Sequence, residues 1–463
     1  MTLVLMLCTM LVPLLWTLHN KGDVAFYLLV PTIMSASQNV YLLTTADELE
    51  ASELQFAIVL NFAFAVLAWA ALLGARSQAA GHATDRGRAL RRTLAACAFL
   101  VTAYGLVSSV IFAAPVTSAL ASYRNLITPM LFTAIGLLAA GFASPRRYMR
   151  MLVVLGVLSC AFGLLEMTTP RFWQDLGIKE LWEDKGIGVN PSTGVPSNYF
   201  SSELIGGSQI RRMVGPFADP VNFGTFLFAV FMAAWAVRAR VAAAVMVVAS
   251  AFAVSKGALV GFLAYFAYWT RYFASRTHHV VAIMVALAGA AYFYGFSLRS
   301  STGSTTAHIN GLLAAFLELP QHPLGRGMGN IGVLSNLFGE GAESNVTESG
   351  LGMIVGQLGI VGLTVYVVFF AALLKAAFRV RSRRPRLMAV GLLVGFIINA
   401  TFNEVALSPN SAAPYFVMIG LVLGRDLMLD QENESYAAVD ERDLRLEWGP
   451  ASGIPSPHEQ RTA

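Results

Sequence analysis

Ionisable side chains are scarce in this sequence, and several of them gather in one polar interval between residues 299 and 350. This interval carries His308, Arg326, Glu343 and Glu348, and it lies between two apolar stretches. The pKa of a histidine is near neutral, so His308 could take a proton from a substrate hydroxyl, and either glutamate could do the same. The alternative for each of these residues is a solvated surface group with no part in chemistry.

Three cations that stand beside apolar stretches form a second set of candidates. Arg211 and Arg212 precede a Gly-Pro pair and the apolar stretch that begins at Phe217. An arginine there can hold a phosphate through two parallel hydrogen bonds, or it can extend toward lipid headgroups with no substrate involved. Lys256 interrupts an apolar run, where a charge is costly unless it faces a polar cavity, an anionic ligand or the membrane surface. These residue types and positions favour the binding of an anionic group.

A glycine-punctuated segment, PLGRGMGN, follows within the same polar interval. Gly325, Gly327 and Gly329 predict a turn in which the backbone can approach a ligand closely. No Cys/His cluster in the sequence has the spacing of a zinc site, and no nucleotide-binding loop is present. The three cysteines fall inside apolar stretches, and we interpret them as packing residues. The sequence therefore predicts a site that needs no metal and no cofactor.

The composition indicates which elements must position these residues. Of the 463 residues, 56% are hydrophobic and only 13% are charged, whereas soluble domains carry about 25% charged residues. A helix needs about 20 apolar residues to cross a membrane. We therefore predict an all-α, polytopic membrane helix bundle of 12–13 spans. The predicted spans are residues 2–18, 24–43, 54–74, 93–113, 125–143, 151–167, 217–237, 241–254, 258–270, 280–296, 351–374, 387–401 and 412–424.

The basic residues predict the orientation of these spans. Five connections rich in arginine or lysine fall on one side if the spans alternate, and the positive-inside rule places that side in the cytoplasm. The opposite, extracytoplasmic side then receives the two long loops, residues 168–216 and 298–350. The second of these is predicted to be a large loop with its own helix over residues 305–319.

The remaining segments complete the predicted organisation. Residues 1–424 are expected to form one transmembrane domain, and residues 425–463 a disordered acidic cytoplasmic tail. In the first outer loop, RFWQDLGIKELWEDKG predicts an amphipathic helix with Trp173 and Trp182 on one face. Such a helix would lie in the headgroup layer of the membrane, or it would pack on the neighbouring loop.

Four segments, in order along the chain, resemble the O-antigen ligase and polymerase (Wzy/WaaL-like) family of membrane glycosyltransferases. RRMVGPFADPVNFGTFLF is similar to that family's Arg-x-x-Gly-x-Phe-x-x-Pro approach to a span and puts Arg212 on the arginine. AVSKGALVGFLA is similar to its Ser-Arg-Gly element, with Lys256 in place of arginine. HPLGRGMGN and ESNVTESGLGMIVGQLGIVGLTVYV complete the resemblance, which covers residues 211–366 best.

The resemblance implies a GT-C-related helical fold and the metal-independent transfer of a glycan from a polyprenyl diphosphate carrier. The diphosphate would be bound by cations of the outer face, Arg212, Lys256, Arg211 and Arg326. The acceptor proton would be taken by an ionisable residue of the large loop, His308, Glu343 or Glu348. Ligases of the family carry a His-Asn pair near the end of this loop, where the present chain has Glu-Ser-Asn. That departure favours a polymerase.

We therefore expect a membrane polymerase that joins polyprenyl-diphosphate-linked repeat units into a surface polysaccharide, such as O-antigen, capsule or exopolysaccharide. It would act at the outer face of a bacterial inner membrane. The expected partners are the lipid-linked donor and acceptor, membrane lipids, a flippase and a chain-length regulator, and no nucleic acid. The nearest alternative is a ligase that transfers the polymer to another acceptor. A transporter or flippase for the lipid-linked glycan is the alternative from another class, and it predicts broken helices or paired ionisable groups at the membrane midplane.

Overall fold

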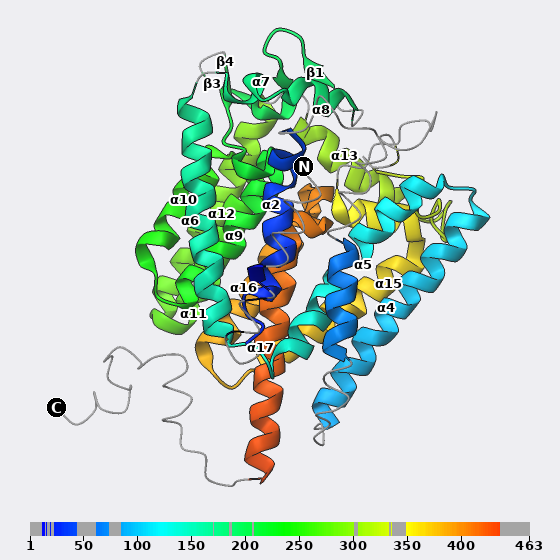
Figure 1. The fold of residues 1–463 in the computed structure, drawn as a ribbon, viewed down its shortest axis with the longest axis vertical. Coiled ribbons are helices and arrows are strands. Elements are labelled where there is room, and N and C mark those ends of the chain that lie inside the picture. The colour runs from blue at the N-terminus through cyan, green and yellow to red at the C-terminus, as the bar shows by residue number, and fades with distance from the viewer. Residues whose placement is uncertain are drawn as a thin grey trace, which may run out of the picture.

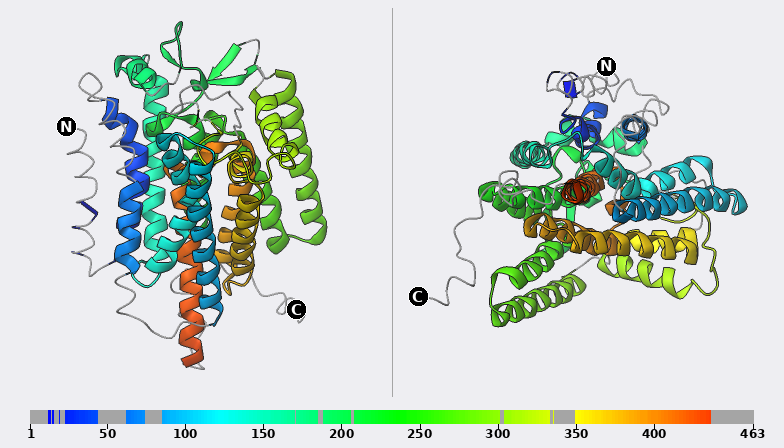
Figure 2. Two further views of the ribbon diagram at one scale, coloured as in Figure 1. Left: turned by 90° about the vertical axis from the view of Figure 1, so that its right-hand side faces the viewer. Right: turned by 90° about the horizontal axis from the view of Figure 1, so that it is seen from below.

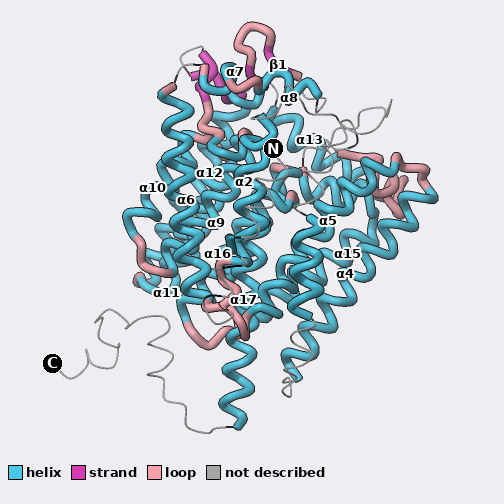
Figure 3. Tube along the Cα trace, in the orientation of Figure 1, coloured by secondary structure: helices cyan, strands magenta, loops and turns pink. Residues whose placement is uncertain are grey.

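The computed structural model describes residues 23–43, 62–73, 85–169, 171–184, 188–205, 208–300, 304–332 and 349–435, together with residues 12, 13, 15, 19 and 335. Over these ranges the chain is almost entirely helical, as the sequence predicts, and the long helices run side by side in one bundle (Figure 1). The short strands, α7, α8 and α13 all lie toward one end, which we call the hairpin end (Figures 1 and 3). Helix α17 ends at the opposite end.

The first half of the described chain holds one 3-10 helix and several α-helices. They are η1 (Tyr27–Leu29), α2 (Val30–Leu43), a helix over residues 62–73, α4 (Asp85–Ile111), α5 (Val116–Ala139) and α6 (Pro145–Thr168). The second half contains α9 (Pro220–Ala236), α10 (Arg240–Phe252), α11 (Lys256–Phe273), α12 (Arg276–Ser300), α13 (Ser304–Leu317), α15 (Gly350–Phe378), α16 (Arg383–Phe402) and α17 (Pro409–Ser435). Every predicted span from residue 93 onward coincides with one of these helices.

Six of the described helices are long and apolar enough to cross a membrane. They are Asp85–Ile111, Pro145–Thr168, Arg276–Arg299, Gly350–Phe378, Arg383–Phe402 and Pro409–Met428, and shorter apolar helices cover Phe62–Leu73, Pro220–Ala236 and Arg240–Phe252. Large apolar side chains on the outside of the bundle remain exposed, among them Val110 on α4 at 80% and Leu158 on α6 at 62%. Lipid, unlike water, is a favourable environment for such surfaces. The chain is therefore an all-α polytopic membrane protein. The predicted span at residues 2–18 lies almost wholly outside the described residues.

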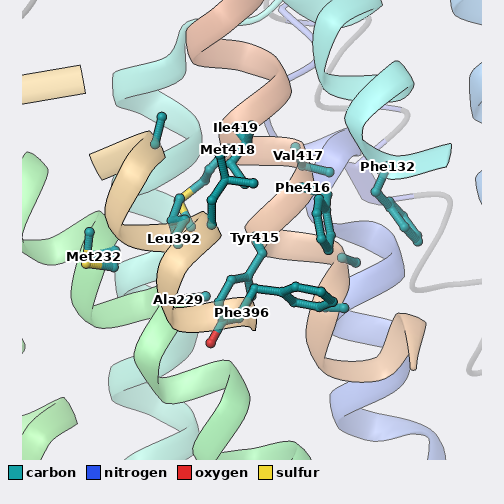
Figure 4. Close-up of a cluster of buried hydrophobic side chains, with 14 of the residues drawn as sticks. Phe132, Ala229, Met232, Leu392, Phe396, Tyr415, Phe416, Val417, Met418 and Ile419 are labelled. Atoms are coloured by element: carbon teal, nitrogen blue, oxygen red, sulfur yellow. The ribbon is translucent and has the colours of Figure 1, made fainter. Parts of the chain in front are cut away.

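Helix α17 occupies the middle of the bundle, as the view along its axis shows (Figure 2). It packs most extensively on α5, where Gly136 and Gly420 face backbone atoms of the opposite helix. Small residues at such a crossing let two membrane helices approach closely. Around α17 lie buried aromatic rings, with Phe396 of α16 against Phe416 at a centroid distance of 4.7 Å (Figure 4). This rigid centre positions the segments at the hairpin end.

Polar residues cap the N-termini of several helices, where the chain passes from a loop into the helix. Ser144 accepts a hydrogen bond from the backbone N–H of Arg147 at the start of α6, and Asp219 accepts from Val221 and Asn222 at the start of α9. A proline occupies the first helical position in both cases. Such caps satisfy N–H groups that have no partner inside the helix. These caps fix where each helix begins and therefore where the preceding loop ends.

Residues 171–211, which we call the outer cap because they cover the hairpin end of the bundle, differ from the predicted amphipathic helix. The predicted helix is broken into α7 (Phe172–Asp175) and α8 (Ile178–Asp184), because Gly177 has a left-handed backbone with φ +74°. The rings of Trp173 and Trp182 are buried inside the protein, so the alternative that places them in the headgroup layer is wrong. Two antiparallel hairpins follow, β1 (Val189–Asn190) with β2 (Val195–Pro196) and β3 (Phe200–Ile205) with β4 (Ser208–Arg211).

The predicted start of the tail also needs correction. Helix α17 continues past residue 424 to Ser435. Asp426 holds this part of the helix, because its carboxylate accepts a hydrogen bond from the backbone N–H of Arg381 at 2.9 Å and pairs with Arg86 at 3.4 Å. Asp426 therefore joins this part of α17 to the start of α4 and to the loop before α16. Residues 436–463, the rest of the predicted tail, lie outside the described ranges.

Candidate functional site

Arg212 follows strand β4 and is held over the turn between α10 and α11. Its Nε donates to the carbonyl of Ala253 at 2.9 Å, and its Nη2 donates to the carbonyl of Val254 at 3.3 Å. A third bond runs from Nη1 to the carbonyl of Asn198 at 3.2 Å. The backbone joins the same contact, because the N–H of Met213 donates to Phe252. The guanidinium is thus fixed in one orientation by backbone oxygens from two segments.

Lys256 lies at the same turn, as the first residue of α11. Its ammonium donates to the hydroxyl of Ser202, on strand β3, at 3.2 Å. Arg212, which follows the β3–β4 hairpin, is therefore bound to the turn just before Lys256, and Lys256 is bound to that hairpin. The positive end of the α11 dipole is in the same place. The structure brings together two of the predicted anion-binding residues.

Arg211, the neighbour of Arg212, has a different environment. Its Nη2 donates to Glu166 Oε2 at 2.9 Å, and its guanidinium lies 4.7 Å from the centre of the Tyr199 ring. Glu166 also accepts from the indole N–H of Trp173 at 2.9 Å and from the backbone N–H of Val214 at 2.9 Å. Because the charge of Arg211 is balanced by this fully buried carboxylate, we interpret Arg211 as a residue that positions the outer cap.

Gly257, the residue after Lys256, contacts a group of buried polar side chains. Gly257 packs directly on Asn399 of α16, so a side chain at position 257 would overlap the Asn399 amide. Asn399 donates through Nδ2 to the hydroxyl of Thr225 at 2.6 Å and accepts from Asn403 Nδ2 at 2.9 Å. Buried amides of this kind need partners, and here they satisfy one another. The group ends at η5 (Glu404–Leu407), the segment that begins next to Asn403.

Glu404 is a buried carboxylate at the hairpin end, with 4% of its surface exposed. It lies against Gly332, where an added Cβ would come within 2.7 Å of the Glu404 Oε2. Gly332 has a φ of +101°, so a side chain there would also be strained. Glu404 is not among the residues predicted from the sequence. The sequence feature that could have identified Glu404 is its position, since it is a carboxylate directly between two apolar spans on the predicted outer side.

The glycine-rich turn connects Glu404 to α15 and to the corner between α4 and α5. Gly325, Gly327 and Gly329 all have positive φ values, so the predicted turn is confirmed. A Cβ on Gly325 would come within 2.6 Å of Gly359, and one on Gly329 within 2.6 Å of Ala119. The backbone of this turn therefore approaches other protein backbone closely, which is a packing reason for its glycines.

Helix α15 is interrupted where the glycine-rich turn meets it. Gly359 has φ +60°, which breaks the helical backbone inside the segment Gly350–Phe378. The backbone groups freed at the break bond to the glycine-rich turn. The N–H of Ile360 donates to the carbonyl of Pro323. The backbone N–H groups of Arg326 and Gly327 donate to the carbonyls of Gly356 and Gln357, respectively. A broken membrane helix needs such substitutes, because lipid offers no hydrogen bonds. The turn and the helix break thus form one structural unit.

Among the described residues, no contact places the other predicted site residues at the Arg212–Lys256 turn. The Arg326 guanidinium pairs with Glu318 at 2.7 Å, at the end of α13 rather than at that turn. His308 lies on α13, and its side chain is outside the described part of the structure. Glu343 and Glu348 both lie outside the described residues. Their predicted roles stay predictions.

Two further ionisable residues near this end were missed from the sequence. Arg124, in the N-terminal half of α5, has a buried Nε without a hydrogen-bond partner, and no described carboxylate forms an ion pair with its guanidinium. Asp219, the cap of α9, is partly buried, and this burial raises its pKa although the Asn222 and Val221 N–H groups and nearby Arg212 act in the opposite direction. The sequence feature that could have identified both residues is that each is a single ionisable residue within apolar sequence.

Comparison with known proteins adds no relative, since neither a protein-family model nor a curated protein matches the chain.

Proposed function

We propose that this protein is a membrane glycosyltransferase that polymerises polyprenyl-diphosphate-linked repeat units at the hairpin end of the bundle. The observation that carries the proposal is the meeting of Arg212 and Lys256 at the α10–α11 turn, beneath the β3–β4 hairpin. Two fixed cations and a helix N-terminus favour a group that carries several negative charges. A lipid diphosphate at the membrane surface has this chemistry.

In the proposed reaction, a hydroxyl of the acceptor sugar attacks the anomeric carbon of the donor glycan. A new glycosidic C–O bond forms, and the C–O bond to the diphosphate breaks. The diphosphate leaves with the electron pair, and the hydroxyl proton passes to a base. Arg212 and Lys256 would stabilise the charge that develops on the leaving group, which is effective when donors are held in place before the reaction.

Four residues are candidates for the base. His308, Glu343 and Glu348 follow from the resemblance to the ligase and polymerase family. Glu404 is the fourth candidate, because Gly257, next to Lys256, packs on Asn399, and Asn399 is bonded to Asn403, the residue before this buried carboxylate. A carboxylate held in position can take the proton of an acceptor hydroxyl that comes within hydrogen-bond reach.

The proposal is tested by replacing Arg212 with glutamine in cells that depend on this protein for polymer. We expect single repeat units to accumulate and the ladder of longer polymers to disappear. Arg171→Gln is the matched control, since Arg171 is an exposed arginine of the same outer cap. Equal amounts of each protein in the membrane must be confirmed by immunoblot. A normal ladder in the Arg212 variant would contradict the proposed role of this residue.

The same experiment separates the two alternatives. Loss of a ligase would leave full-length lipid-linked polymer, and loss of a flippase would leave lipid-linked repeat units on the side where they are made. The helix break at Gly359 is the kind of feature a transporter would need. Its backbone groups, however, are bound to the glycine-rich turn of the same chain, which favours a structural role for the break. We therefore retain the polymerase as the proposal.

A further inference from the structure

A second group of cations lies at the end of the bundle opposite the hairpins, where α9, α11 and α16 come together. Arg240, at the start of α10, has its guanidinium 3.8 Å from the centre of the Trp235 ring. Arg383, at the start of α16, lies 4.4 Å from the Phe273 ring and 5.0 Å from the Tyr272 ring. Arg386 lies 5.8 Å from the same tyrosine. Arginines from two separate loops thus cover aromatic rings of α9 and α11.

These aromatic rings form a continuous row between the two loops. Trp235 meets Trp269 edge to face at a centroid distance of 5.9 Å, and Trp269 stacks on Phe273 at 4.8 Å. The row therefore runs from beneath Arg240 to beneath Arg383. Tryptophan and tyrosine are enriched where membrane helices meet the headgroup layer. We place this row at that level, because α9 and α11 end here and α16 begins here.

The arginines of this cluster lie close to one another and lack acidic partners among the described residues. Arg384 is within electrostatic reach of Arg238 and Arg240, which repel it. Within the described ranges no carboxylate pairs with Arg240, Arg383, Arg384 or Arg386. The Nε of Arg386 is buried and has no hydrogen-bond partner.

Some other arginines at this end of the bundle are paired. Arg86 forms an ion pair with Asp426 at 3.4 Å, and Arg147 pairs with Asp23. The positive-inside rule accounts for basic residues in these loops, but it does not require that several converge without a counter-charge. Like charges held together are unfavourable unless an anion binds among them. An external anion is the missing partner that this arrangement fits.

We propose that the cluster of Arg240, Arg383, Arg384 and Arg386 binds a phosphate group, carried by the headgroup of an acidic phospholipid. Guanidinium groups bind phosphate through paired hydrogen bonds, and the aromatic row beneath them suits the interface where headgroups lie. The site is separate from the Arg212–Lys256 turn, which lies at the other end of α10 and α11. The proposal does not depend on the proposed enzymatic function.

The test uses the whole purified protein in detergent, with native mass spectrometry and thermal unfolding in the presence of phosphatidylglycerol or phosphatidylcholine. We expect phosphatidylglycerol to remain bound and to raise the unfolding temperature, whereas phosphatidylcholine does neither. The double variant Arg383→Gln/Arg384→Gln should bind phosphatidylglycerol about tenfold to thirtyfold more weakly. The control pair Arg146→Gln/Arg150→Gln, on α6 at the same end, removes the same charge and should bind like the unchanged protein.

Inorganic phosphate distinguishes the source of the anion. If inorganic phosphate does not stabilise the protein as phosphatidylglycerol does, the ligand is the lipid. If inorganic phosphate stabilises the protein equally and the double variant loses this stabilisation, the cluster is a phosphate site that takes a soluble ligand. Should the double variant fail to fold, Arg240→Gln gives the same comparison with one charge removed. Equal weakening by the α6 control pair, or equal binding of the two lipids, would overturn the proposal.

Discussion

Arg211 and Glu166 form an ion pair of 2.9 Å that joins the outer cap to helix α6, with the carboxylate side chain fully buried. The same carboxylate binds Trp173 of α7 and the backbone of Val214. Glu166 therefore holds three segments of the cap, and its partner Arg211 stands directly before Arg212. The position of the predicted anion site depends on this connection.

Replacing Glu166 with glutamine should destabilise the protein by about 3 kcal/mol, because it leaves the Arg211 guanidinium without its counter-charge in a partly buried position. Thermal unfolding in detergent measures the effect. Adding Arg211→Met to the same chain removes the unpaired charge and should restore part of the stability. If the double variant is as unstable as the sum of the two single variants, the ion pair does not hold the cap.

Replacing Gly325 with alanine should destabilise the protein by about 1–3 kcal/mol, because the new Cβ meets the backbone of α15 at a position with φ +76°. Gly295→Ala is the matched control, since nothing lies within 4 Å of a Cβ on this helical glycine. There alanine should be neutral or slightly stabilising. Limited proteolysis and thermal unfolding compare the two. Similar behaviour of both variants would contradict the close contact between the turn and the α15 break.

Asp219 should make the stability of the protein depend on pH. Its pKa is raised by burial in the folded state, so the folded protein binds a proton more tightly than the unfolded chain does. The contribution of this group is then greatest below the ordinary aspartate pKa and is lost as the pH rises through the raised value. Asp219→Asn keeps a capping side chain and removes the titration. The difference in unfolding temperature between the two proteins, followed from acid to neutral pH, should change with this sign; a constant difference would contradict it.

The sequence predicted the helices well because their apolar stretches are long enough to cross a membrane. It predicted the glycine-rich turn because closely spaced glycines are unfavourable inside a helix and favour positive φ values. It did not predict the break at Gly177 or the burial of Trp173, because an amphipathic pattern does not say whether lipid or protein covers the apolar face. The end of α17 was missed since the sequence after Gly424 is charged, and Asp426 there is held by partners far away in sequence, such as Arg86.

For the candidate site, too, some features could be predicted from the sequence and others could not. Arg212 and Lys256 could be selected from the sequence because isolated cations next to membrane spans are unusual, and the structure brings both to one turn. The different environment of Arg211 could not be predicted, since its partner Glu166 precedes it by a whole loop. Glu404 was missed for a related reason: its proximity to Gly332 depends on how α15, α16 and the glycine-rich turn pack together.

The central claim is that Arg212 and Lys256 hold the diphosphate of a lipid-linked glycan. The most direct measurement uses the purified protein in lipid vesicles with a polyprenyl-diphosphate-linked repeat unit, in the presence of a metal chelator, and follows polymer length on a gel. We predict a ladder of products for the unchanged protein and for Lys256→Arg, and a rate about 10²–10³-fold lower for Lys256→Ala. Undiminished polymerisation by Lys256→Ala, or no polymer from the unchanged protein with this donor, would contradict the account.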